Sequence, residues 1–108
     1  MRSYAAAMTE SSDWRLQGQD MYLRGVELQW KRYRAHSETW EHDHCSFCWT
    51  KFADPEFSAA HRELAAREDT LLEGYTTTSE HEQGADYHWV CARCFSDFAE
   101  AFEWRVVS

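Results

Sequence analysis

The clearest periodic pattern in the chain is the alternation of hydrophobic and polar residues over positions 21–33, which predicts a half-buried β-strand. The two sides of this strand separate hydrophobic from polar residues: Val26, Leu28 and Trp30 on one side, Glu27, Gln29 and Lys31 on the other. Further strands are predicted over residues 71–78, which include three consecutive threonines, and over residues 87–90. The polar segment between them contains Gly84, so these two strands are expected to form a β-hairpin.

A helix is predicted over residues 54–68 from its start signals. Asp54 is expected to be the N-cap, Pro55 to occupy the first helical position and Glu56 to complement the helix dipole. Its buried side is expected to hold Phe57, Ala60, Leu64 and Ala65.

The last predicted element is a helix over residues 92–104. Its hydrophobic residues recur at i, i+3, i+4 and i+7, which is the stripe of a helix that packs on a core: Phe95, Phe98, Ala99 and Phe102. Residues 1–19, in contrast, are polar and without periodicity, and are predicted to form a loose N-terminal tail in which Trp14 and Leu16 are the candidates for docking. Residues 20–108 are predicted to form a single domain.

The four cysteines form two identically spaced pairs, Cys45-x-x-Cys48 and Cys91-x-x-Cys94. The first pair lies in the aromatic segment 39–52, which is predicted to be a short strand followed by a tight knuckle. The second pair lies where a predicted strand becomes a helix, and a helix N-terminus stabilises the thiolate that a metal requires. Two such pairs far apart in a short chain are typical of a tetrathiolate site, and they predict one structural Zn²⁺ held by these four residues.

The small size of the chain and its expected location in the cytoplasm favour zinc binding over other uses of the cysteines. A chain of 108 residues buries a modest fraction of its surface, and a metal would add stability. The sequence has neither a hydrophobic signal core nor an apolar run of about 18 residues, so it is expected to be cytoplasmic, where thiols stay reduced. Disulfides, redox thiols and iron are less favoured. Rubredoxin-type iron knuckles usually have a glycine soon after each pair, whereas Trp49 and Phe95 stand there.

The order of these elements resembles the treble-clef group of zinc fingers. The resemblance covers about residues 40–104 and depends on the two cysteine pairs: a knuckle, a β-hairpin and then a helix with the second pair at its start. It implies an α+β domain stabilised by zinc and no particular activity. The extra helix predicted over residues 54–68 departs from the treble-clef pattern and leaves a looser zinc ribbon as the alternative fold. It is also similar to small, uncharacterised bacterial proteins with H-D-H-C…C and W-V-C…C-F patterns.

Histidines near the first cysteine pair raise two further possibilities, a histidine ligand and an enzyme. His42 and His44 are candidate replacements for a cysteine ligand or donors to a thiolate, although four cysteines already complete the site. An HNH-type nuclease is disfavoured because the chain has no Asn and no His follows Cys94. A zinc deaminase is excluded because only six residues separate the His36-x-Glu38 motif from Cys45 and no Pro precedes either pair. The protein is therefore expected not to be an enzyme.

The formal net charge of −8 bears on the choice of partner. It disfavours nucleic acids and anionic membranes, and it favours solubility or a protein partner with a basic surface. We therefore expect a protein-interaction module: an inhibitor, such as an immunity protein against a basic toxin, or an adaptor. One alternative is a nucleic-acid-binding zinc ribbon that uses the basic stretch from Arg24 to Arg34. Another is a non-catalytic subunit of an enzyme complex.

Overall fold

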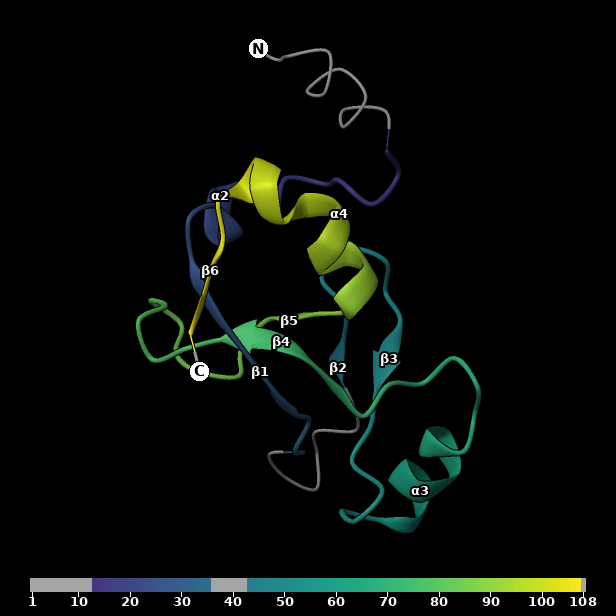
Figure 1. Ribbon diagram of the computed structural model, residues 1–108. Helices are drawn as coiled ribbons and strands as arrows, with labels where there is room; N and C mark the ends of the chain where they lie inside the picture. Colours follow the sequence, from purple (N-terminus) through teal and green to yellow (C-terminus); the bar gives the residue numbers. More distant parts are fainter. Residues whose placement is uncertain (1–12, 36–42, 108) are drawn as a thin grey trace.

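The structure of the protein, a computed structural model, describes residues 13–35 and 43–107 (Figure 1). Over these ranges the chain is an α+β fold, as predicted, with one four-stranded and one two-stranded sheet. The helices are α2 (Asp20–Leu23), α3 (Ala59–Ala65) and α4 (Ala92–Phe102). The strands are β1 (Glu27–Arg32), β2 (Asp43–His44), β3 (Lys51–Phe52), β4 (Glu73–Thr77), β5 (Trp89–Val90) and β6 (Arg105–Val107).

The larger sheet has the strand order β5-β4-β1-β6. Strand β1 runs antiparallel to β4 and parallel to β6. Strands β4 and β5 are the predicted hairpin, shortened at its ends, and β5 leads directly into Cys91. The smaller sheet pairs β2 with β3, which enclose the first cysteine pair. The amide of Ser46 donates to the carbonyl of Trp89 over 2.8 Å, so the two sheets bring both cysteine pairs together.

The first predicted strand is wrong in its first half. The chain forms the short helix α2 there, and Gly25 then adopts a left-handed φ of 72° before β1 begins. Its amide donates to the carbonyl of Phe102 over 2.7 Å, which fixes this turn to the end of α4. Trp30 is also 46% exposed although it was expected inside with Leu28, and its ring packs edge-on against Tyr75.

Helix α3 begins at Ala59, later than the predicted residue 54, and ends at Ala65. Asp54 instead accepts from the amide of Glu56 within a preceding turn, and Ser58 is the N-cap, its hydroxyl accepting from the amide of His61 over 3.2 Å. The predicted buried face is also shifted: Ala60 is exposed, whereas His61 is only 3% exposed. The His61 side chain is held inward because its Nδ1 accepts from the amide of Asp54 over 3.0 Å, a bond that closes the turn before the helix onto its first residues.

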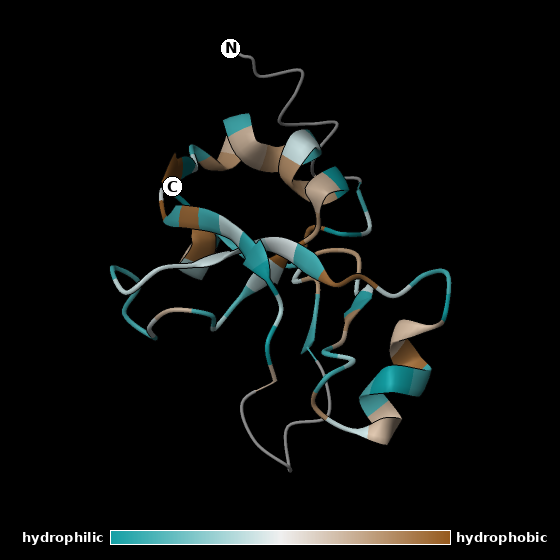
Figure 2. Cartoon of the chain, turned by 60° about the horizontal axis from the view of Figure 1, so that its bottom comes forward, coloured by the Kyte–Doolittle hydropathy of each residue, from teal (hydrophilic) through white to brown (hydrophobic). Residues whose placement is uncertain are grey.

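Helix α4 has the predicted hydrophobic stripe, in which Phe98 and Phe102 are buried. The helix ends at Phe102 because Glu103 adopts a left-handed conformation. Trp104 is therefore outside the helix, where its indole N–H donates to the carbonyl of Leu23 over 2.7 Å. Strand β6 begins at the next residue, Arg105, and was not predicted from the sequence. In Figure 1 helix α4 lies at one end of the molecule and α3 at the other, and Figure 2 shows α3 with a hydrophilic middle between hydrophobic ends.

The N-terminal segment was predicted to be loose up to residue 19. Residues 1–12 lie outside the described residues, while residues 13–19 lie against the body of the protein. Leu16 packs against the core, whereas Trp14 is 65% exposed. The side chain of Gln19 is buried and reaches the carbonyl of Ser46 over 3.0 Å.

Gly74 supports the packing between the two sheets and provides a test of it. A Cβ at this position would lie 2.7 Å from Phe52 Cε1 and 3.1 Å from the carbonyl oxygen of Val90. Phe52 is fully buried, so its ring has no room to move away. We expect Gly74→Ala to lower the free energy of unfolding by about 1–3 kcal/mol, measured by urea denaturation. The loss should be smaller in a Phe52→Leu background, because leucine lacks the ring atoms in question. Equal losses in both backgrounds would show that this contact is not responsible.

Candidate metal centre

The structure brings the four cysteines of the two pairs into one cluster. The sulfurs of Cys45, Cys48, Cys91 and Cys94 all lie within 4.8 Å of one another, and those of Cys48 and Cys91 are 3.7 Å apart. A tetrahedron with Zn–S bonds of about 2.3 Å has its sulfurs about 3.8 Å apart. The four thiols are therefore positioned to bind one metal ion. Over residues 13–35 and 43–107, this is the only group of three or more His, Cys, Asp or Glu side chains placed to do so.

The first pair is positioned by the tight turn between β2 and β3. The amide of Cys45 donates to the carbonyl of Thr50 over 2.8 Å, and the amide of Trp49 donates back to the carbonyl of Cys45 over 3.1 Å. Trp49 has a left-handed φ of 68°, which is uncommon for a residue other than glycine. The turn therefore supplies the knuckle that the spacing predicted, with a tryptophan where a glycine is the usual solution.

The second pair is positioned by the start of α4. Cys91 is the N-cap of this helix, and its sulfur accepts from the amide of Cys94 over 3.4 Å. Because both residues lie in the first turn of α4, the free N–H groups of that turn and the helix dipole favour negative charge on their sulfurs.

Each of the four sulfurs has a neighbouring hydrogen-bond donor. Cys45 Sγ accepts from the amides of Phe47 and Cys91, over 3.5 and 3.4 Å. The Thr50 hydroxyl lies 3.1 Å from Cys48 Sγ, and Arg15 Nη1 lies 3.6 Å from Cys94 Sγ. Donors of this kind offset the negative charge that accumulates when four thiolates surround one divalent cation.

The close spacing of the thiols sets their protonation in the absence of a cation. Hydrogen bonds from the Cys45 and Cys94 thiols lower the pKa of Cys91, while the bonds that Cys94 donates to Cys45 and Cys91 raise the pKa of Cys94. The proton bound by Cys94 therefore supports the charge on Cys91. A divalent cation at the centre of the cluster would take the place of such protons, which is the exchange expected of a thiolate metal site.

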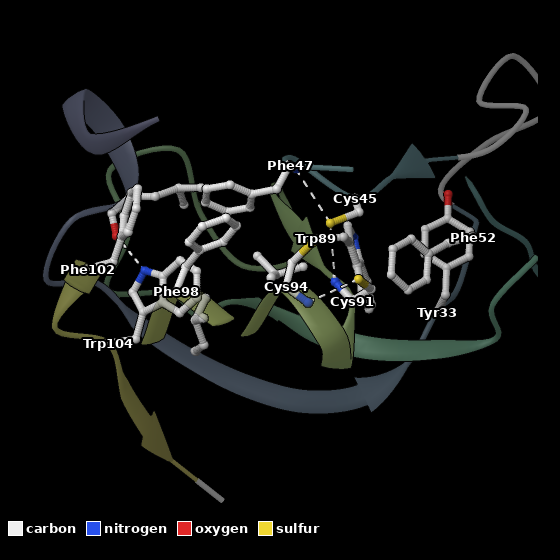
Figure 3. Close-up of a cluster of buried hydrophobic side chains, with 13 residues drawn as sticks. Tyr33, Cys45, Phe47, Phe52, Trp89, Cys91, Cys94, Phe98, Phe102 and Trp104 are labelled. Carbon is white, nitrogen blue, oxygen red and sulfur yellow. Dashed lines mark hydrogen bonds between the residues drawn. The ribbon is translucent and has the colours of Figure 1, made fainter. Parts of the chain in front are cut away.

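Two groups of aromatic rings flank the cluster and hold its backbone in place (Figure 3). On one side Phe47 stacks on Phe98 with 5.0 Å between ring centroids, and Phe102 and Trp104 complete the group. On the other side Trp89 packs against Tyr33 and Phe52, with centroid distances of 5.1 and 5.3 Å. Figure 3 shows the sulfurs of Cys45, Cys91 and Cys94 between these two groups.

The four cysteines differ in their exposure to solvent. Cys45 and Cys94 are fully buried and Cys91 is 5% exposed, whereas Cys48 is partly exposed. A hollow of about 750 Å³ opens beside them, lined by Cys48, Cys91 and Cys94 together with residues 13–15 and Arg93. Cys48 is therefore the most exposed of the four cysteines, and it lies at this hollow.

Within residues 13–35 and 43–107, no histidine belongs to the cluster. His44 is exposed and its ring packs at a tilt against Trp49, with 4.4 Å between centroids, while His42 lies outside the described residues. The His88 ring contacts the rings of Tyr22 and Tyr87, and burial lowers its pKa to about 4. His61, which carried no motif, is buried under α3.

Two residues that contact the sulfurs, Thr50 and Arg15, were not predicted from the sequence. Thr50 follows the knuckle closely, so its hydroxyl was a foreseeable donor. Arg15 is 79 positions from Cys94 and belongs to no motif, so only the folded chain brings it there.

Comparisons with known proteins do not assign a family to the chain: no family model, curated protein or solved structure matches it. Among the described residues, no helix is both long and apolar enough to cross a membrane.

Proposed function

We propose that this protein is a zinc-binding interaction module whose fold is held together by one structural Zn²⁺ on Cys45, Cys48, Cys91 and Cys94. The observation that carries the proposal is the cluster of four sulfurs within 4.8 Å of one another, each next to a hydrogen-bond donor. Soft thiolates in a tetrahedral set of four are the ligands that zinc takes in structural sites. We assign no catalytic step to this centre, because four cysteine ligands leave no coordination position for a water molecule.

Metal analysis tests the identity of the ion. Protein purified without affinity metals should contain one zinc per chain, and the chelated protein should lose its folded circular dichroism and regain it with Zn²⁺. A red protein that contains iron, or a chain that keeps the same melting curve with and without chelator, would contradict structural zinc.

We further propose that the fold is a treble-clef variant. The arrangement that supports this is a knuckle between β2 and β3, the β4–β5 hairpin, and a helix whose N-cap is the third cysteine. Helix α3 is inserted between the knuckle and the hairpin. Because α3 lies away from α4 in Figure 1, the insertion leaves the metal centre intact.

Two surface features favour a protein partner. Trp30 is 46% exposed, and its ring is held by Tyr75, which in turn stacks on Phe95 with 3.9 Å between centroids. A large aromatic side chain held rigidly at the surface is typical of interface hot spots. The second feature is a set of exposed carboxylates suited to steering a basic partner: Glu80, Glu82, Glu100 and Glu103. We propose an inhibitor, of the immunity-protein kind, or an adaptor; a non-catalytic enzyme subunit would present the same features.

The alternative of nucleic-acid binding is weakened by the surroundings of the basic stretch. Lys31 pairs with Asp86 over 3.0 Å, and Arg32 and Arg34 both pair with Glu56 over 3.7 Å. Arg24 donates to the carbonyl of Ala101 over 2.9 Å. These cations already face acidic groups or a carbonyl, so each would need to exchange that partner for a phosphate.

Native mass spectrometry of the protein captured from its own cells tests the interaction. The expected spectrum shows the chain with one zinc and a stoichiometric basic protein. Trp30→Ala should reduce that complex, whereas Tyr87→Ala, which removes another exposed aromatic side chain outside both cysteine pairs, serves as the matched control. A zinc-loaded chain without a protein partner that instead shifts RNA or DNA at low salt, and loses the shift in Arg32→Ala and Arg34→Ala, would favour the nucleic-acid alternative.

A further inference from the structure

Residues 13–19 contact both halves of the cysteine cluster, although they lie far from either pair in the sequence. The Gln19 side chain is 3% exposed, and its Nε2 donates to the carbonyl of Ser46 over 3.0 Å and to that of Arg15 over 2.7 Å. Ser46 lies inside the first Cys-x-x-Cys pair, so the side-chain amide of Gln19 links residues 13–19 to the knuckle by a hydrogen bond.

Arg15 fastens the same segment to α4. Its Nη1 donates to Asp97 Oδ2 over 2.9 Å and reaches Cys94 Sγ over 3.6 Å, and its guanidinium carbon lies 4.5 Å from the centre of the Phe98 ring. Its Nη2 donates to Asp13 over 2.7 Å. The Arg15 side chain is only 16% exposed, so it is held in this position by contacts on several sides.

The Arg15 contact matters because the sulfur of Cys94 depends on it for a hydrogen-bond donor from outside the cysteine cluster. Cys94 Sγ is fully buried, and among the hydrogen bonds of the described residues the only donor to it from outside the cysteine cluster is Arg15. Cys45 and Cys91, in contrast, receive backbone amides. A zinc with four thiolates has a net charge of −2, and a buried cationic donor offsets part of it.

We infer that Arg15 is a positioning residue of the metal centre: it donates a charge-assisted hydrogen bond to the Cys94 sulfur and, together with Gln19, links residues 13–19 to metal binding. This inference rests on the proposed zinc site. By linkage, the docked segment strengthens the hold on the metal, and the metal strengthens the docking of the segment.

Chelator competition with the full-length protein tests the inference. Arg15→Gln should lose zinc affinity by about 10-fold, the lower end of what such outer contacts contribute, and Arg15→Lys should lose less because it keeps the positive charge. The matched control is Arg93→Gln. Arg93 is exposed, neighbours Cys94 and lines the same hollow, but it makes no hydrogen bond to a sulfur within the described part of the chain.

A spectroscopic readout separates a contact with the sulfur from a general loss of stability. In the Co²⁺-loaded protein, the sulfur-to-cobalt charge-transfer band should shift in Arg15→Gln and stay unchanged in Arg93→Gln. Equal affinities for wild type and Arg15→Gln, or equal losses for Arg15→Gln and Arg93→Gln, would overturn the inference. A wild-type chain that binds neither Zn²⁺ nor Co²⁺ would instead overturn the proposed zinc site itself.

Discussion

Replacing Cys91 by serine is expected to abolish tight metal binding and to leave the chain largely unfolded. Cys91 is at once a ligand of the proposed site, the N-cap of α4 and the acceptor of the Cys94 amide. A structural zinc supplies about 10–16 kcal/mol of apparent binding free energy in small zinc-dependent folds, whereas a domain has only about 5–15 kcal/mol of net stability. The measurement is far-ultraviolet circular dichroism with and without Zn²⁺, together with the zinc content of the purified variant.

The matched control for this substitution is Ser96→Ala, an exposed position of α4 outside both cysteine pairs. It should leave the zinc content and the melting temperature unchanged. If Cys91→Ser also melts like the wild type, zinc does not hold this fold together and the central proposal fails.

Replacing Trp89 by alanine is expected to produce the largest loss of stability outside the cysteines, about 3–5 kcal/mol of the free energy of unfolding. Trp89 is 1% exposed and packs against Tyr33 and Phe52, and its indole N–H donates to the carbonyl of Asp86 over 3.2 Å. Its removal would leave a large cavity beside the strand that delivers Cys91. Urea denaturation at saturating Zn²⁺ measures the loss.

Trp30→Ala is the comparison for this second substitution. The Trp30 ring is 46% exposed and contacts one ring, Tyr75, at its edge, so its removal should cost less than Trp89→Ala. If the two substitutions lowered the free energy of unfolding by similar amounts, the buried aromatic group around Trp89 would not contribute more to stability than an exposed ring does.

The parts of the fold that were predictable are those specified by local signals. The stripe of Phe98 and Phe102 predicted α4, because a 3.6-residue period places these residues on one face. The run of threonines predicted β4, and the polar segment after it predicted the hairpin. The spacing within each cysteine pair predicted a turn with two sulfurs on one side, which is the geometry at Cys45 and Cys48.

The errors arose where a distant residue competed with a local signal. Aspartate is a favoured N-cap residue, which is why the helix was predicted to begin at Asp54. Its carboxylate instead accepts from the amide of Ala35 over 3.2 Å, and its own amide donates to His61 Nδ1. These two bonds fix the turn at Asp54 before α3 begins. Residues near position 21 alternate as in a strand, yet Gly25 and its bond to Phe102 make them a helical turn. Trp30 has the periodicity of a core residue, but its place in the sheet leaves it partly exposed.

The spacing of the cysteines was enough to identify the four thiols that the structure brings into one cluster, because two Cys-x-x-Cys pairs in a short chain are typical of a single metal site. The sequence by itself also determined the helix that carries the second pair and the hairpin that leads to it. The surroundings of the sulfurs, in contrast, could be known only from the folded chain: Arg15 at Cys94, Gln19 at the knuckle, and the two aromatic groups on either side. This difference arises from the distance in sequence over which each kind of interaction acts. Spacing and periodicity act over a few residues, whereas the charge and packing around a buried sulfur come from segments that meet only when the chain has folded.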